Sequence, residues 1–159
     1  MLLNSLFIAE TEEKGRGVFT HEKIDAGTII EIAPVLVMTA DERKLLDQTL
    51  LHDYIFEWGA EKKQCAMALG WVPVYNHSYE SNSEYFMDFD DASMYVKTVR
   101  FIDAGEEITI NYNGNWNDSK KVWFDVKWKQ LHQGNSYFYF SPFSSVYLCS
   151  PVAGLILPH

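Results

Sequence analysis

Gly105-Glu106-Glu107-Ile108-Thr109-Ile110-Asn111-Tyr112 is the stretch of sequence that decides the fold. Its glycine favours a turn, and isoleucine at every second position predicts a strand with one buried face. The predicted strand runs from Glu107 to Tyr112, which places a phenol at the point where the strand ends. Alone, such a stretch is typical of many β proteins, so its meaning depends on the motifs that accompany it.

Two further motifs lie upstream: Lys14-Gly15-Arg16-Gly17-Val18-Phe19, and Asn76-His77-Ser78 with Asn82. A Gly-x-Gly loop lets bare backbone approach a ligand closely and offer its N–H and C=O groups to it. Asn76 follows an apolar run and stands a short interval before a second asparagine. Each motif alone is more often a simple turn, whereas the three in this order form a highly specific combination.

Short extended segments punctuated by turns fill most of the chain. Strands are predicted at residues 7–10, 14–19, 28–30, 54–58, 64–69, 86–90 and 93–102, the last two as a hairpin. Thr39-Ala40-Asp41-Glu42 is a capping box, and it predicts a short helix that ends near Leu51. Residues 117–133 fit either a strand or a helix ended by Gly134, and the sequence leaves both open.

Aromatic residues are abundant, at 15% of the chain. Tyr54, Phe56 and Trp58 alternate with other residues, which predicts three aromatic side chains on one face of a strand. Residues 135–159 are also rich in aromatics, but Pro142, Pro151 and five serines interrupt them. A membrane span needs roughly 20 continuous apolar residues, so this segment is interpreted as a packed aromatic strap and no membrane partner is expected.

Length and charge limit the organisation and the partners. A chain of 159 residues with 47% hydrophobic residues suits one domain. We expect residues 1–134 to form its body, with a helical insert at about 39–51, and residues 135–159 to belong to the same domain as the strap. The net charge of −9 disfavours direct nucleic-acid binding, which requires clustered Lys and Arg, and suits a basic protein partner. A homodimer through the aromatic strap is left open.

Cysteines and acidic clusters predict no metal site. Cys65 and Cys149 stand far apart with no histidine at ligand spacing, so neither a zinc site nor a disulfide framework is indicated. Asp88, Asp90 and Asp91 lack the Gly and distal Glu of a calcium loop and predict a solvated hairpin turn. The N-terminus has no basic region before its short apolar run, so a cytoplasmic location is expected.

In order and separation, the three motifs resemble those of the SET-domain family of protein lysine methyltransferases, over roughly residues 7–114. The resemblance implies a mainly β fold with short helices, the β-clip architecture of several small sheets, and a knot-like crossing of the C-terminal strand through a loop. It also implies S-adenosyl-L-methionine as cofactor and methyl transfer to the ε-amine of a lysine in a protein substrate. Without the cysteine-rich zinc segment of many relatives, the chain looks most like the stand-alone bacterial or viral members.

The same resemblance implies roles for individual residues. Tyr112 matches the active-site tyrosine, although family members commonly carry Asp where this chain has Asn111. We expect Tyr112 to align the amine more than to carry a proton, because a phenol of pKa about 10 is a poor base at neutral pH. Cofactor binding is implied for Lys14, Gly15, Arg16, Gly17, Asn76 and His77, with Asn82 bracing their loop. Aromatic candidates for the walls of the lysine channel are Tyr75, Tyr79, Trp116, Tyr137 and Tyr139.

A catalytically silent SET-like module that binds a basic peptide is the main alternative. Such a module would have lost motif residues in the cofactor loop or the active-site tyrosine. Asn76, His77 and Tyr112 are all retained, which favours the enzyme. The number of methyl groups transferred depends on the shape of the channel and is left open by the sequence.

Overall fold

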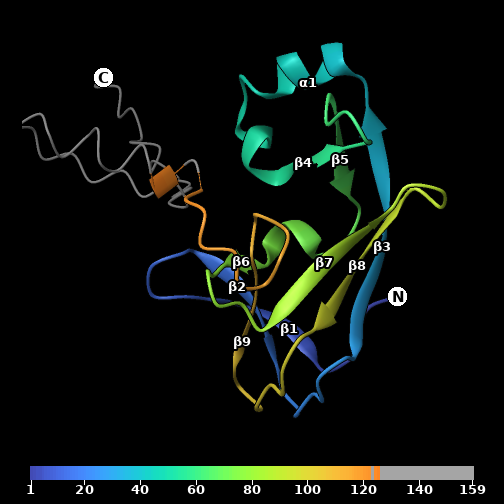
Figure 1. Cartoon of the computed structure of the whole chain (residues 1–159). Coiled ribbons are helices and arrows are strands. Elements are labelled where there is room, and N and C mark those ends of the chain that lie inside the picture. The colour runs from blue at the N-terminus through green and yellow to red at the C-terminus, as the bar shows by residue number, and fades with distance from the viewer. Residues whose placement is uncertain (123, 126–159) are drawn as a thin grey trace, which may run out of the picture.

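The computed structural model describes residues 1–122 and 124–125. Within them the fold is mainly β with short helices, as predicted (Figure 1). The strands are β1 (Leu6–Glu10), β2 (Arg16–Thr20), β3 (Ile29–Met38), β4 (Phe56–Trp58), β5 (Gln64–Ala68), β6 (Asn76–His77), β7 (Ser83–Asp88), β8 (Ser93–Thr98) and β9 (Glu107–Ile110). The helices are α1 (Ala40–Leu46) and the 3₁₀ turns η1 (Leu50–Tyr54) and η2 (Val72–Val74).

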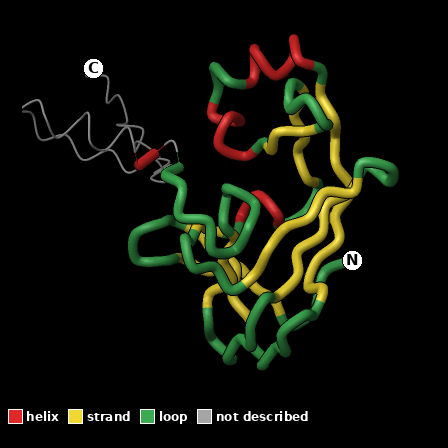
Figure 2. Tube along the Cα trace, viewed as in Figure 1, coloured by secondary structure: helices red, strands yellow, loops and turns green. Residues whose placement is uncertain are grey.

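The strands form two sheets in the described part of the chain, in the orders β1-β2-β9-β6 and β4-β5-β3-β8-β7 (Figure 2). All pairs are antiparallel except β6 and β9, which run parallel. The predicted alternation in β9 is confirmed, because Ile108 and Ile110 are both completely buried. They share the core with Val18 of β2, Ile30 of β3 and Val96 of β8, so one apolar core joins the two sheets.

The capping box at Thr39 is confirmed, but the helix that follows is shorter than predicted. The Thr39 hydroxyl accepts the amide hydrogen of Glu42, and the Glu42 carboxylate accepts that of Thr39. The helix ends at Leu46 and does not continue to Leu51. Thr49 is extended, with φ −123° and ψ 172°, and its hydroxyl caps the separate turn η1. A second threonine cap therefore divides the insert into two short helices.

The aromatic strand at 54–58 was predicted too long. Tyr54 closes η1 and is 43% exposed, whereas Phe56 and Trp58 lie on β4 and Trp58 is buried. The hairpin of β4 with β5 is confirmed. The hairpin of β7 with β8 is confirmed too, and the Asp88 carboxylate accepts the two amide hydrogens of its acidic turn.

Several predictions for the C-terminal part lie outside the described residues. These are the aromatic strap at 135–159, its channel candidates Tyr137 and Tyr139, and most of the ambiguous segment 117–133. Of that segment, residues 117–122 form neither helix nor strand, and residues 124–125 are helical. None of the described helices is both long and apolar enough to cross a membrane.

Candidate active site

The parallel pairing of β6 with β9 brings two of the three motifs together. His77 stands opposite Ile110 in this pairing, two residues before Tyr112. The amide of Tyr112 donates to Nδ1 of His77 at 3.2 Å, and the two ring centroids are 5.1 Å apart. The Tyr112 hydroxyl donates to the carbonyl oxygen of Tyr75 at 3.1 Å. The phenol is therefore held at the start of the β6 segment.

The glycine loop joins this cluster from β2. The Lys14 ammonium donates to the carbonyl oxygen of His77 at 2.9 Å. Nδ2 of Asn76 donates to the Arg16 carbonyl at 3.3 Å and to Oε1 of Glu107 at 2.7 Å. The three motifs, separated by up to about 90 residues in sequence, thus meet at one place.

Glycine at position 17 permits this meeting without displacing its neighbours. A Cβ atom there would overlap Oε1 of Glu107 and lie 2.9 Å from Nδ2 of Asn76. Gly15 has φ +71°, a conformation that glycine adopts without strain. Each glycine of the motif therefore has a steric role: Gly17 allows the close approach of Asn76 and Glu107, and Gly15 allows the turn.

His77 is buried and neutral. Burial, together with the Lys14 ammonium, lowers the pKa of its imidazole to about 4, against the opposing influence of Asp125. Because Nδ1 accepts a hydrogen bond, the neutral ring carries its hydrogen on Nε2. This Nε2 is buried and has no hydrogen-bond partner among the described residues. Such an orphan donor is the kind of group that a bound ligand with an acceptor atom would satisfy.

Asn82 and Asn111 brace the same region from within the core. Asn82 accepts the amide hydrogen of Thr109 at 2.9 Å and donates to the Glu107 carbonyl at 2.7 Å, so it fixes the loop after β6 onto β9. Asn111 is completely buried; it donates to the Asp118 carbonyl and accepts the amide hydrogen of Asn113. An aspartate could not make that donation when ionised, so an asparagine suits this position.

A cavity of about 540 Å³ has Tyr112 in its lining. Val72, Pro73 and Tyr75 line it from the η2 segment, and Phe56, Tyr85 and Phe89 supply further aromatic rings. Its charged lining residues carry both signs: Arg43, Asp47, Asp53, Glu57, Lys62 and Lys120. Burial, and then the Asp53 carboxylate, raise the pKa of Tyr112 well above its ordinary value, so the phenol stays protonated.

Of the three predicted channel aromatics that the structure describes, only Tyr75 lines this cavity. Tyr75 lines the cavity, yet it is completely buried and its hydroxyl donates to Glu31. Tyr79 lies 4.5 Å from His77 by ring centroids and donates to Asp125, outside the cavity lining. Trp116 is 41% exposed, and its amide donates to Glu84.

Three aromatic residues that were not among the channel candidates line the cavity: Phe56, Tyr85 and Phe89. The Tyr85 hydroxyl donates to the carbonyl of Tyr112 at 3.3 Å, and its ring packs edge-on against Phe56 at 5.2 Å. The alternating pattern of residues 54–58 placed Phe56 on one face of a strand with other aromatic residues, and so could have suggested it. Tyr85 carried no such signal, because it precedes the strand predicted at 86–90.

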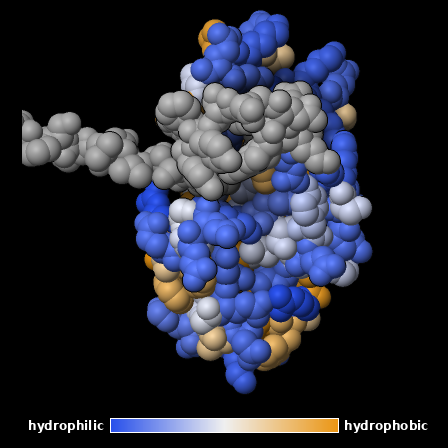
Figure 3. Space-filling view, turned by 90° about the vertical axis from the view of Figure 1, so that its left-hand side faces the viewer, coloured by the Kyte–Doolittle hydropathy of each residue, from blue (hydrophilic) through white to orange (hydrophobic). Residues whose placement is uncertain are grey.

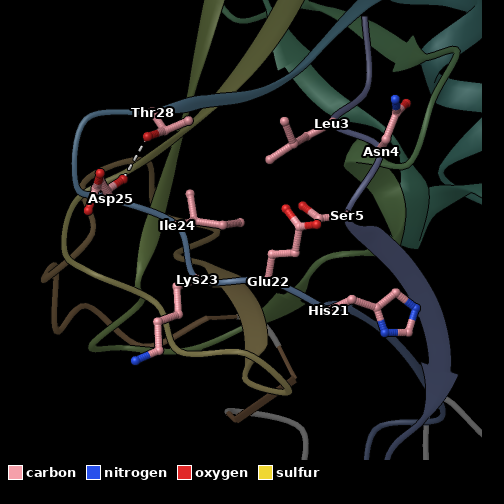
Figure 4. A pocket seen from close by; sticks show the side chains of 9 residues that line it. All are labelled: Leu3, Asn4, Ser5, His21, Glu22, Lys23, Ile24, Asp25 and Thr28. Carbon is pink, nitrogen blue, oxygen red and sulfur yellow. Dashed lines mark hydrogen bonds between the residues drawn. The ribbon is translucent and has the colours of Figure 1, made fainter.

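A second hollow of about 500 Å³ lies near the N-terminus of β1, between residues 3–5 and 21–28 (Figure 4). It contains none of the predicted site residues. The face shown in Figure 3 is largely hydrophilic, with apolar residues gathered toward its lower end. Among residues 1–122 and 124–125, no cluster of His, Cys, Asp and Glu could hold a metal ion.

Comparison with known proteins agrees with this geometry. The family model of the SET domain matches residues 15–113, which include all three motifs except Lys14. The chain belongs to the SET-domain family. It is 34% identical over 126 residues to a histone-lysine N-methyltransferase of Schizosaccharomyces pombe that is specific for H3 lysine-37, covering 79% of this chain and 80% of the relative. This family and this relative make the chain, by class, a protein-lysine methyltransferase.

A solved structure matches the fold of this SET-domain chain. It is a Plasmodium falciparum protein assigned to the histone methyltransferases, with 28% sequence identity and a TM-score of 0.55. The match covers 70% of this chain and 99% of the solved chain. The predicted fold class is thereby confirmed for the several small sheets of the SET domain.

Proposed function

We propose that this SET-domain protein binds S-adenosyl-L-methionine and transfers its methyl group to the ε-amine of a lysine in a basic protein. The observation that carries the proposal is the position of Tyr112. Its backbone amide binds the buried imidazole of His77, while its side chain lines the cavity. One residue therefore belongs both to a cluster that suits a cofactor and to the lining of a cavity that suits a side chain.

The residues of the cluster fit such a cofactor. Lys14, Gly15, Arg16, Gly17, Asn76 and His77 would hold it. The loop gives close access to backbone groups, and the Nε2–H of His77 lacks a partner among the described residues. When bound, the cofactor would supply a methyl group on a sulfonium for transfer to a neutral lysine amine, with a C–N bond formed, the C–S bond broken and the thioether S-adenosyl-L-homocysteine as the leaving group.

Asn76 offers the cofactor an acceptor. Its Nδ2 group has two hydrogens, and the Arg16 carbonyl and Glu107 carboxylate take both. Neither partner can donate a hydrogen as a carbonyl or a carboxylate, so the amide cannot be turned over without losing both bonds. Oδ1 is therefore the atom left to bind a donor group, which suits the α-amino group of the cofactor.

Tyr112 aligns the lysine amine. Its hydroxyl hydrogen goes to the Tyr75 carbonyl, so toward the cavity the oxygen acts as an acceptor of an amine N–H. The raised pKa of Tyr112 makes it a poor proton carrier, because the phenolate form is disfavoured. Holding reactants in a near-attack geometry can remove about 7–11 kcal/mol of barrier, which makes alignment a sufficient role.

A histone-like substrate is supported by two observations. The relative from Schizosaccharomyces pombe is named for lysine 37 of histone H3. The chain itself has a net charge of −9, which favours encounter with a basic protein. We therefore propose a basic, lysine-bearing protein segment as the substrate.

Titration calorimetry with S-adenosyl-L-methionine tests cofactor binding. Transfer of a labelled methyl group to histone H3, and to a basic protein that is not a histone, tests the substrate class. The Tyr112→Phe variant is the control: it should lose methyl transfer while it still binds the cofactor. Absence of cofactor binding by the wild-type protein would refute the proposal, and binding without transfer to any lysine would favour the silent module.

A further inference from the structure

Glu31 is a buried carboxylate near the start of β3, only 2% exposed. Its Oε1 accepts the amide hydrogen of Trp71 at 2.7 Å, and its Oε2 accepts the hydroxyl hydrogen of Tyr75 at 2.9 Å. These two partners flank the η2 turn on either side. Gly70 comes just before Trp71 and the turn. A Cβ atom there would overlap Oε1 of Glu31, so the glycine leaves room for the carboxylate.

The segment that Glu31 holds is the wall of the cavity at Tyr112. Val72, Pro73 and Tyr75 line the cavity, and the Tyr75 carbonyl accepts the Tyr112 hydroxyl at 3.1 Å. Tyr75 therefore links Glu31 to Tyr112, through its side-chain hydroxyl on one side and its backbone carbonyl on the other. Glu31 itself does not line the cavity.

Stability alone gives no reason for a carboxylate here. Burial raises the pKa of Glu31, and its hydrogen bonds and the N-terminal ammonium oppose this only in part. A neutral amide could accept the Trp71 amide hydrogen without that desolvation cost. What a carboxylate adds is a second acceptor oxygen, so that it holds the Trp71 amide and the Tyr75 hydroxyl at the same time, whereas an amide has only one oxygen.

We propose that Glu31 is a positioning residue for methyl transfer, which holds Tyr75 and the η2 turn so that the Tyr75 carbonyl fixes the Tyr112 hydroxyl at the cavity wall. This role rests on the methyl transfer proposed above. It adds a residue from β3, outside all three sequence motifs, to the machinery of the site.

The test compares Glu31→Gln, Tyr75→Phe and the double variant with the wild-type protein. Thr98→Val is the matched control, because Thr98 is also buried and hydrogen-bonded, to Asp25 and Thr28, but does not line the cavity. For each variant we would measure Tm, the Kd for S-adenosyl-L-homocysteine, and kcat and KM for the protein substrate.

Glu31→Gln should retain or raise Tm, keep Kd and KM within about twofold, and lower kcat about tenfold or more, because small misplacements of reacting groups cost large factors in rate. The double variant should lose no more activity than the worse single variant, since both break the same link. Thr98→Val should lower Tm while leaving kcat unchanged.

A kcat of Glu31→Gln within twofold of wild type would overturn the assignment, as would losses that multiply in the double variant. If Glu31→Gln does not fold, Tyr75→Phe alone decides, because it breaks the link at its other end and must lower kcat with Kd retained. Failure of the proposed function is distinguishable, since it would show as no transfer by the wild-type protein.

Discussion

Replacing Glu107 by alanine removes the acceptor that orients the Asn76 amide. The bond from Nδ2 of Asn76 to Oε1 of Glu107 is 2.7 Å long, while the remaining bond to the Arg16 carbonyl is longer, at 3.3 Å. A hydrogen bond to a charged group contributes about 1.5–3 kcal/mol. Because Glu107 is only half-buried, the lower end of that range applies, and about 1.4 kcal/mol corresponds to a tenfold change in affinity.

We therefore expect Glu107→Ala to weaken binding of S-adenosyl-L-homocysteine about tenfold in calorimetry. Glu107→Gln is the matched control, because its carbonyl oxygen can still accept from Asn76, and it should stay within about threefold of wild type. A cofactor analogue that lacks the α-amino group adds a sharper measurement. The analogue should bind more weakly than the full ligand to the wild-type protein. This difference in affinity should be smaller in Glu107→Ala, where the Asn76 amide can rotate by 180°. Unchanged affinity in Glu107→Ala, or an unchanged ratio between the two ligands, would refute the orienting role.

Three further predictions follow from the same geometry. Tyr112→Phe should abolish methyl transfer while the Kd for the cofactor stays within about twofold; undiminished methylation would contradict alignment by the hydroxyl. Asn111→Asp should lower the free energy of unfolding by about 1–3 kcal/mol in urea titrations at neutral pH, because an ionised carboxylate cannot donate to the Asp118 carbonyl; equal stability would show that this bond is dispensable. Since the folded pKa of His77 is about 4 and its ordinary value is 6.5, the unfolded chain takes up a proton first as the pH falls. Stability should thus decline between about pH 6.5 and 4 by up to about 3 kcal/mol from this residue, and His77→Gln should remove that share of the slope.

The elements that could be predicted from sequence are those whose signals are local. Isoleucine at every second position marked β9, and the capping box at Thr39 marked the start of α1. The end of that helix was missed because two short-range signals compete there. Thr49 caps a new turn three residues after Leu46, and the apolar residues that follow resembled a continuation of the helix.

The cavity walls could not be predicted because they depend on how strands are paired. Tyr85 faces the cavity through the pairing of β7 with β8 and the contact of its ring with Phe56. Trp116 and Tyr79, predicted for the lysine channel, do not line this cavity; the Trp116 carbonyl accepts the Ser81 amide hydrogen, and the Tyr79 hydroxyl accepts that of Val122. Aromatic composition indicates how many such side chains exist, whereas register decides which of them share a space.

Two carboxylates show the same limit in another form, Glu31, which is buried, and Glu107, which is half-buried. In the sequence, Glu31 is one acidic residue within a β-branched run, and Glu107 is the second of two adjacent glutamates, so both match solvent-facing positions of a strand. In the fold, each instead occupies space left by a missing side chain, Glu31 beside Gly70 and Glu107 beside Gly17. Each carboxylate then accepts a hydrogen from a residue that leads to the reaction, Tyr75 in one case and Asn76 in the other. The glycines and the glutamates of this site are therefore coupled pairs, and a side chain added at either glycine would displace the carboxylate that positions its neighbour.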